Sequence, residues 1–575
     1  MENKSGVSDR DSGMSNKKHI FFFITGLFCL SALVMLRQLI SSAYFSCIIQ
    51  DSFDYTSWAW QFTQALKEGV IYPRWLPLNF WGYGSPTFIL YPPLAFYLVG
   101  LFNVFTGSVI SAMNLTKFAA LFLTGLGMFF LVKEFYSVKT ALMTASFYIV
   151  FPYQIFQLYF TGGFTSVLSL MWFSPTVLFT WRYIKNKQYK DILYAGICYG
   201  GLILTHLLNA YMFAFVLTAF IFYTSVTQNR LRDLILIPSI IMIGLLISAA
   251  YIIPLIYEKQ FINTRAFTIE GFNFANFFIL PNLTSRLPSG SFWPVYYDIH
   301  LFFLFFFCSL IVLSFLRIVK FRQIKAPEGV YAVNVVFLFS GICSLFLLFG
   351  VSRTIWETVP FFKYIQFPMR WLNITTFAVV FLSAVLFTDI DVFHKKKRNN
   401  LFIVTLFLTC FLFDYKYINS AHLFTENELL PVKSINWNLV HLPVGVNIDE
   451  FDENNEDEEG SRIMKGEGKA IIATWRSAER VIEISAQTPL ILRIRTFNFP
   501  GWHAYIDSVR TEIGTEGGTG AMLITIPQGD HTVVLRFEDT PVRYYAKIVS
   551  VISFFIMVLL VLIPKKAKRT SITGI

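Results

Sequence analysis

The chain has 575 residues, of which 55% are hydrophobic, 18% are aromatic and only 14% are charged. That charged share lies far below the ~25% of soluble globular proteins, which excludes an ordinary soluble enzyme and a disordered or fibrous chain. The net charge of +11 comes from Lys and Arg in short clusters between apolar runs, a pattern of membrane proteins rather than of nucleic-acid binders. The six Cys residues show neither a disulfide framework nor a metal-ligand spacing.

Residues 1–19 predict a cytoplasmic N-terminal tail. The apolar run that follows is longer than the core of a signal peptide and lacks a small-residue cleavage site, so we expect a retained signal-anchor. Twelve segments are apolar and long enough, at about 17 to 25 residues, to cross a bilayer as helices. These predicted spans are 20–41, 115–132, 140–157, 165–182, 191–207, 209–226, 232–254, 300–318, 331–350, 370–390, 400–417 and 545–564.

A further apolar stretch, 88–105, contains the pair Pro92-Pro93 and is only just long enough to cross. If it does not cross, the basic clusters all fall on one side of the membrane, which the positive-inside rule makes the cytoplasm. If it crossed, the early and later clusters would face opposite compartments. We therefore expect an in-plane or re-entrant helix within a first outer loop, 42–114, of a membrane body over 20–417. Both termini are expected in the cytoplasm, and the whole chain in the cytoplasmic membrane.

Residues 418–543 differ in character, because their 19 Asp and Glu outnumber 11 Lys and Arg. Six short runs there mostly alternate apolar and polar residues, which predicts antiparallel strands with one buried face. The runs are 470–475, 480–485, 490–497, 503–507, 522–526 and 531–537. We expect a small extracytoplasmic β-sandwich, followed by the last span and a basic cytoplasmic tail over 544–575. Its acidic run 449–459 indicates a solvated loop, with a calcium site as the alternative, although the EF-hand spacing is missing.

The first outer loop carries the candidate chemistry. Asp51 and Asp54 follow the first span closely, so they are expected at the boundary of water and lipid headgroups. An amphipathic helix is predicted over 55–68, lying along the membrane surface. The region 70–94 then holds five Pro and two Gly, which preclude a regular helix. Arg74 in its centre could pair with a carboxylate or bind a lipid phosphate.

Several motifs at these positions resemble a known family. They are YPRW (72–75), GYGSP (82–86) and YPPL (91–94) in the outer loop, and FPGWHAYID (499–507) and IPQGDHTVVLRF (526–537) before the last span. They resemble the membrane proteins described as 6-pyruvoyl-tetrahydropterin synthase-related and the YfhO-like membrane proteins. Both groups are similar to the glycosyltransferase C superfamily. The resemblance implies a polytopic helical membrane protein of about twelve spans that transfers a sugar from a polyprenyl-phosphate carrier to an extracytoplasmic glycan, lipid or protein.

The resemblance also implies site residues. In that superfamily an acid at the start of the first outer loop acts as the base or orients the acceptor hydroxyl, and Asp51 is the matching residue, with Asp54 as a candidate for a second acidic role. Cations would stabilise the departing phosphate. The expected substrate-binding residues are Tyr72, Arg74, Trp75, His206, Arg286 and Arg370.

Two departures from the family pattern bear on the mechanism. Relatives often carry a His one turn beyond the first acid, where this chain has Tyr55, and an acid in the loop matching 152–164, which contains none here. No Asp-x-Asp motif follows Asp51, so no metal site is predicted and dependence on a divalent metal stays open. Two other functions remain: a transporter or lipid-glycan flippase, and a non-catalytic membrane scaffold for envelope assembly.

Overall fold

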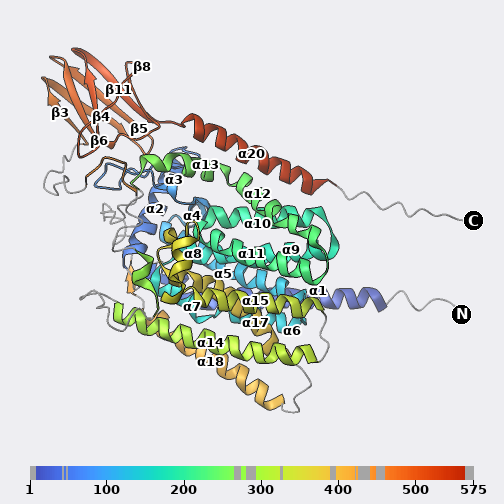
Figure 1. Ribbon diagram of the computed structural model, residues 1–575. Helices are drawn as coiled ribbons and strands as arrows, with labels where there is room; N and C mark the ends of the chain where they lie inside the picture. Colours follow the sequence, from blue (N-terminus) through green and yellow to red (C-terminus); the bar gives the residue numbers. More distant parts are fainter. Residues whose placement is uncertain are drawn as a thin grey trace, which may run out of the picture.

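A computed structural model of the protein describes residues 8–41, 44–46, 49–263, 273–279, 293–323, 328–388, 396–420, 422–424, 441–447 and 460–563. Figure 1 shows a helical body with a β-rich region at one end. The first helix, α1 (Ser8–Ser41), begins on the side of the body that faces away from the strands, and the last helix, α20 (Pro541–Leu562), ends on that same side.

Nine helical segments in the described part of the chain are long and apolar enough to cross a membrane. A tenth crossing would be the pair α12 (Leu236–Ile247) and α13 (Ala249–Glu258), whose helices are bent by 83° at the break between them. The nine segments are Ile20–Ser41, Val109–Lys133, Val138–Thr161, Phe164–Asn186, Leu207–Thr227, Phe302–Lys320, Gly329–Phe346, Pro368–Phe387 and Pro541–Leu562. The protein is therefore polytopic, and the number twelve stays a prediction.

Two of the predicted spans, 191–207 and 400–417, correspond to α10 (Tyr189–Thr205) and α18 (Lys396–Ser420). The doubtful stretch 88–105 is divided between the short helix α3 (Thr87–Leu90) and α4 (Leu94–Thr106), and the 13 residues of α4 are too few to cross a bilayer. The other helices are α2 (Ile49–Lys67), α5 (Val109–Lys133), α6 (Val138–Ile149), α7 (Pro152–Phe156), α8 (Phe164–Ser169), α9 (Phe173–Asn186), α11 (Leu207–Thr227), α14 (Trp293–Gln323), α15 (Glu328–Phe346), α16 (Arg353–Thr358) and α17 (Leu372–Phe387).

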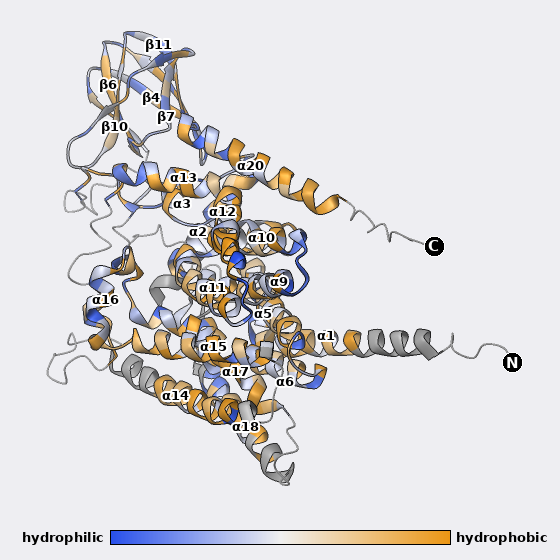
Figure 2. Ribbon diagram, turned by 45° about the vertical axis from the view of Figure 1, so that its right-hand side comes forward, coloured by the Kyte–Doolittle hydropathy of each residue, from blue (hydrophilic) through white to orange (hydrophobic). Residues whose placement is uncertain are grey.

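Burial separates central helices from peripheral ones. In α17 every residue is buried, because apolar side chains of α6, α11, α14 and α15 surround it. The apolar side chains of α20 are largely exposed instead, as expected of a helix that faces lipid. Figure 2 shows the helices of the body mostly in hydrophobic colours, whereas the strands are mixed.

All six strands predicted from alternation are present, and they lie in two antiparallel sheets. One sheet has the order β3-β6-β10-β9 and the other β4-β5-β11-β7-β8. Alternate residues of both sheets, such as Ile482 and Ile494, enter one shared hydrophobic core. The strands are β3 (Ser461–Lys465), β4 (Gly468–Trp475), β5 (Glu479–Ala486), β6 (Leu490–Phe497), β7 (Trp502–Ile506), β8 (Val509–Thr511), β9 (Gly514–Thr515), β10 (Ala521–Ile526) and β11 (Gly529–Phe537). We call residues 460–540 the β-domain. A separate pair joins β1 (Tyr44–Ser46) to β2 (His422–Phe424).

The loop after α2 packs into the core of the β-domain. Trp75 contacts Trp502 and Phe537 at ring distances of 5.6 and 5.3 Å. Tyr83 stacks on Phe497 at 5.1 Å. Gly84 lies between these contacts with a φ of +80°, and a Cβ there would meet the Trp75 indole at 2.3 Å. Glycine is required at this position for both reasons, so the GYGSP motif serves to dock the β-domain.

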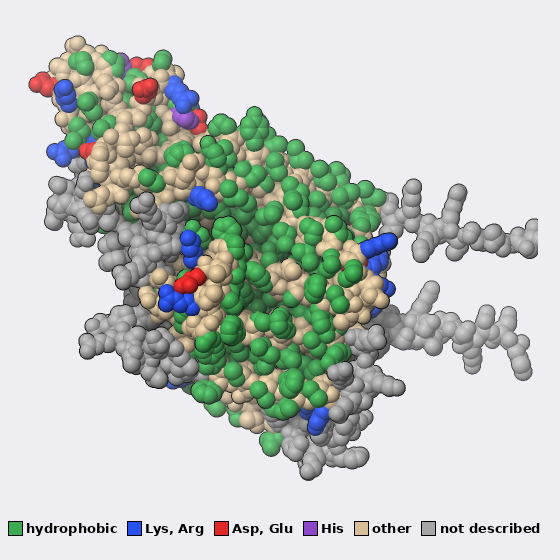
Figure 3. Space-filling view, in the orientation of Figure 1, with side chains coloured by type: hydrophobic (Ala, Val, Ile, Leu, Met, Phe, Trp, Pro, Cys, Tyr) green, Lys and Arg blue, Asp and Glu red, His purple; other side chains and the backbone are tan. Residues whose placement is uncertain are grey.

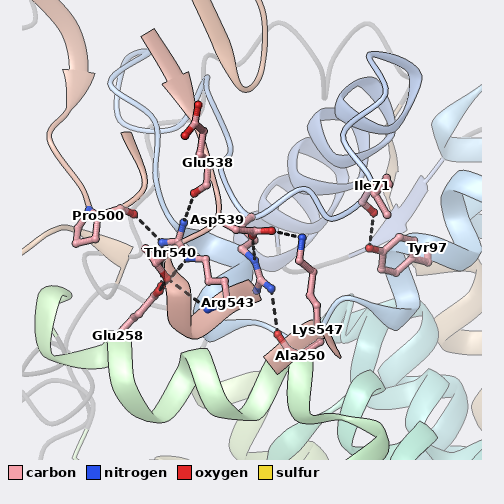
Figure 4. A network of polar contacts seen from close by, with 11 residues as sticks. Ile71, Tyr97, Ala250, Glu258, Pro500, Glu538, Asp539, Thr540, Arg543 and Lys547 are labelled. Carbon is pink, nitrogen blue, oxygen red and sulfur yellow. Dashed lines mark hydrogen bonds and ion pairs between the residues drawn. The ribbon is translucent and has the colours of Figure 1, made fainter. Parts of the chain in front are cut away.

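A buried ion pair fastens the last helix to the body. Arg543, in the first turn of α20, and Glu258, the last residue of α13, are 0% and 1% exposed. The Nε and Nη2 groups of Arg543 donate to the Glu258 carboxylate at 2.9 to 3.0 Å. The same guanidinium donates to the carbonyl oxygens of Pro500 and Glu538 in the β-domain (Figure 4). One side chain thus joins α13, α20 and the β-domain.

Candidate functional site

The two candidate acids lie at the start of α2. Asp51 is in the first turn of this helix and Asp54 in the second. The Asp54 side chain is only 6% exposed. The helix begins earlier than the predicted 55–68, and its apolar face, including Trp58 and Phe62, is buried against α4 and α5. The carboxylate of Asp54 is therefore held among protein side chains rather than in open solvent.

A chain of hydroxyl groups connects this end of α2 to α8. The Tyr55 hydroxyl lies 2.7 Å from that of Tyr91, which in turn lies 2.8 Å from the Thr165 hydroxyl. Tyr55 directly follows Asp54, and Thr165 directly precedes Ser166. The acidic end of α2 is thus coupled by hydrogen bonds to the first turn of α8.

On its other side the first turn of α8 meets a cluster of amides. The side-chain amide of Asn373, in α17, donates to the Ser166 hydroxyl at 3.0 Å and to the side-chain amide oxygen of Asn209 at 3.3 Å. Asn209 of α11 donates to the Ser169 hydroxyl at 2.6 Å. Gln157 donates to Asn373 at 2.7 Å, while its side-chain amide oxygen Oε1 is buried with no hydrogen-bond partner among the described residues. Such an oxygen costs free energy unless a ligand or water binds it.

Two of the predicted binding residues adjoin this amide cluster. His206 caps the N-terminus of α11, where its Nδ1 accepts the backbone N–H of Asn209 at 3.1 Å. Arg370 lies in the short helix Pro368–Trp371, where its Nη1 donates to the Ile365 carbonyl oxygen at 2.7 Å and its guanidinium covers the Phe367 ring at 4.9 Å. Arg370 lies close enough to His206 for the two side chains to interact electrostatically. The other Arg370 nitrogens make no hydrogen bond within the described residues, which leaves donors available.

The backbone here is irregular. The segment Gln157–Thr161 is a π-helix. Gln366, just before Arg370, has a φ of +62°. A π-helix is rare in proteins, and a positive φ is rare in residues other than glycine. Both occur most often at functional sites. We call the region of Asp54, Gln157, Ser166, His206 and Arg370 the α8 site.

The remaining predicted site residues lie elsewhere. Tyr72, Arg74 and Trp75 are at the junction with the β-domain, beyond the far end of α2. From Asp54 to Lys67 the helix rises about 20 Å, at about 1.5 Å per residue. Arg286 and the acidic run 449–459 lie outside the described residues. The sequence-derived set therefore divides into the α8 site and a junction group.

One residue of this region, His441, was not predicted from the sequence. Its Nδ1 lies 3.2 Å from the Thr87 hydroxyl and its ring 5.2 Å from that of Trp58, one turn along α2 from Asp54. The segment 441–447 reaches this place because it pairs with Ile262 on one side and Gly518 on the other. These partners are distant in the chain, so no local pattern could have marked the histidine.

Burial lowers the pKa of His441 to about 4, so its ring is neutral at physiological pH. Because the unfolded chain binds the proton more readily, stability is fully present above pH 6.5 and is lost as the pH falls towards 4, by at most about 3 kcal/mol. We expect His441→Gln to flatten the fall of the unfolding temperature between pH 7 and pH 4.5. His531→Gln is the control: the Asp507 carboxylate raises the pKa of His531, so its removal should not flatten that fall. If the unfolding temperatures of the wild type and of His441→Gln fall equally between pH 7 and pH 4.5, the assignment is contradicted.

Within the described residues no group of three or more His, Cys, Asp or Glu could hold a metal ion.

The fold and the α8 site together define the class: a polytopic helical membrane protein with a β-domain at one end of the helical body and a buried polar site among its helices. Residues 88–418 match the family model described as the 6-pyruvoyl-tetrahydropterin synthase related domain, a membrane protein family. The match covers more than half of the chain, which belongs to this family. The pterin-synthase wording describes the name of the family and assigns no reaction. A comparison with curated proteins gave no match.

Solved structures show a loose likeness. The oligosaccharyltransferase AglB from Archaeoglobus fulgidus, in complex with an inhibitory peptide and a dolichol-phosphate, is 14% identical over 70% of this chain, with a TM-score of 0.44. ArnT from Cupriavidus metallidurans, bound to undecaprenyl phosphate, is 11% identical over 68% of this chain, with a TM-score of 0.43. The chain spans 56% and 63% of their lengths. At these TM-scores the likeness carries no argument about the activity of this chain.

Proposed function

We propose that the protein is a glycosyltransferase that moves a sugar from a polyprenyl-phosphate carrier to an extracytoplasmic acceptor, with the α8 site as its reaction centre. The observation that carries the proposal is that Arg370 adjoins a buried polar cluster around α8, and that a chain of hydroxyl groups links this cluster to Tyr55, the neighbour of the buried acid Asp54. The likeness of the outer-loop motifs to the glycosyltransferase C superfamily supports the same assignment. The acceptor is a cell-surface glycan, a lipid or a protein.

Sugar transfer from a lipid phosphate needs one base and one cation. Asp51 or Asp54 accepts the proton of the acceptor hydroxyl as its oxygen attacks the anomeric carbon of the sugar. The bond between that carbon and the phosphate oxygen breaks, and the phosphate leaves with the electron pair and remains on the polyprenyl chain. Arg370 stabilises the charge that develops on the leaving phosphate. His206 and the side-chain amide oxygen of Gln157 are placed to bind sugar hydroxyls or water.

The orientation follows from the positive-inside rule. The cytoplasmic side is the one on which α1 begins and α20 ends, so the β-domain and the α8 site face outward. Polyprenyl-phosphate sugars present their head groups at a membrane surface, which places the sugar near the outer end of α8 and α11. The β-domain stands next to this end and offers a surface for the acceptor.

The test uses the purified chain in lipid nanodiscs with a polyprenyl-phosphate sugar pool and fractionated surface glycans. Release of polyprenyl phosphate, measured by lipid mass spectrometry, is expected for the wild type. Arg370→Gln should raise KM for the carrier about 10- to 100-fold, because charge-assisted hydrogen bonds to the phosphate are lost. Arg353→Gln is the matched control, since Arg353 is exposed and forms an exposed ion pair with Glu357. Equal carrier consumption in wild type and in nanodiscs without protein would contradict the proposal.

A further inference from the structure

Arg74 is a buried arginine whose hydrogen-bonding capacity is mostly unused. The side chain is 2% exposed. Its Nη2 donates to the carbonyl oxygen of Ala250 at 3.1 Å, and its guanidinium lies 3.8 Å above the Tyr72 ring. Among the described residues its Nε and Nη1 have no hydrogen-bond partner, and the nearest Asp539 carboxylate oxygen lies 3.9 Å from Nε. A desolvated guanidinium with two open donors is costly unless an anion completes it.

The charges around Arg74 do not balance. Asp539 is shared with Lys547, which forms the closer ion pair. Glu258 pairs with Arg543 and also accepts the Thr540 hydroxyl. Three cations, Arg74, Arg543 and Lys547, therefore face two carboxylates, and one positive charge is left over at the junction. Figure 4 shows Asp539 and Lys547 beside each other, close to Ala250. Because Asp539 and Lys547 are 28% and 39% exposed, the cluster is open on that side.

The surroundings indicate what kind of anion reaches this cluster. Ile71, whose carbonyl oxygen accepts the Tyr97 hydroxyl, is 85% exposed, and Tyr544 and Tyr545 at the start of α20 are 55% and 66% exposed. Tyrosines at the end of a lipid-facing helix are typical of the headgroup level of a bilayer. In Figure 3 the hydrophobic face of the body continues up to the base of the β-domain. The anion that fits a cluster at the headgroup level is therefore the headgroup of a lipid, whose apolar chains would lie along the hydrophobic face.

We propose that Arg74 and Lys547 bind the phosphate of a membrane lipid, at a site separate from the α8 site. The planar fork of Arg74 fits two phosphate oxygens, and Lys547 supplies a second positive charge. Trp75, the neighbour of Arg74, packs in the β-domain core, so the bound lipid also stabilises the docked position of that domain. The proposal does not depend on glycosyl transfer, since binding is measured without any reaction.

The experiment measures lipid retention by native mass spectrometry of the full chain released from nanodiscs. The probes are phosphatidylglycerol, a polyprenyl phosphate and an uncharged glycolipid without phosphate. We expect one phosphate-headed lipid per chain whose retention depends on Arg74: its retention should fall 10-fold or more in Arg74→Gln and stay unchanged in Arg353→Gln. Retention of phosphatidylglycerol would identify a general phospholipid site, and retention of the polyprenyl phosphate alone a carrier site. A thermal shift with inorganic phosphate, present in wild type and absent in Arg74→Gln, would show that the phosphate group suffices.

Two outcomes would overturn the proposal: equal retention of phosphate lipids by wild type and Arg74→Gln, or retention of the uncharged glycolipid at the same level. Should Arg74→Gln fail to fold, Lys547→Gln decides, because Lys547 is partly exposed and its loss leaves the buried contacts intact. Unchanged retention in Lys547→Gln would then count against the site. Loss of retention with unchanged carrier turnover would support this site whatever the outcome for the α8 site.

Discussion

Arg543→Met is expected to lower the free energy of unfolding by about 3 to 5 kcal/mol, the cost of removing one partner of a buried ion pair. Glu258 would remain buried without its cation, and the carbonyl oxygens of Pro500 and Glu538 would lose their donor. The expected result is a lower unfolding temperature and faster protease cleavage around 498–501 and 538–540, where the β-domain meets α20. Limited proteolysis in nanodiscs followed by mass spectrometry measures this release.

Two further variants make the interpretation specific. The double variant Arg543→Met with Glu258→Met should recover part of the lost stability, because two apolar side chains can replace a buried ion pair of similar volume. Arg353→Met is the control, since the exposed pair with Glu357 contributes at most about 0.5 kcal/mol. If Arg543→Met unfolds at the same temperature as the wild type, the pair does not fasten the β-domain.

Local patterns predicted much of the fold. The length of apolar runs located the spanning helices, and alternation located all six main strands, because both signals depend on neighbouring residues only. Charge parity also excluded 88–105 as a span, and α4 is indeed too short to cross. The bend between α12 and α13 was not predicted, because neither Ser248 nor the flanking apolar residues break a helix by their own preferences.

The site was predicted only in part, because its members meet through tertiary contacts. The spacing YPRW suggested one binding motif, yet Trp75 packs with Trp502 and Arg74 faces Asp539. These partners are more than four hundred residues away, and no periodicity in the sequence records that pairing. Arg370 and His206 were expected from the family resemblance, and the structure places both at helix ends beside the same polar cluster.

The sharpest consequence of the α8 site concerns its acids. Asn has the shape of Asp but cannot accept a proton, so replacement of the true base should lower kcat about 10²- to 10⁴-fold with little change in KM for the carrier. We expect Asp51→Asn to show this loss, with a smaller effect of Asp54→Asn if Asp54 only orients the acceptor. The wild-type rate should fall at low pH as the base is protonated, and the variant that removes the base should lose this acidic limb.

The pH profile distinguishes a base from a structural carboxylate. A carboxylate that only supports the fold would lower the amount of active protein and the unfolding temperature but leave the acidic limb in place. Glu357→Gln, which breaks the exposed pair with Arg353, serves as the control and should change neither the rate nor its fall at low pH. If both Asp variants keep rates within threefold of the wild type at normal protein levels, chemistry at α2 is excluded. The polar cluster around Ser166, Asn209 and Asn373 would then fit the binding site of a transporter or a scaffold better than a reaction centre.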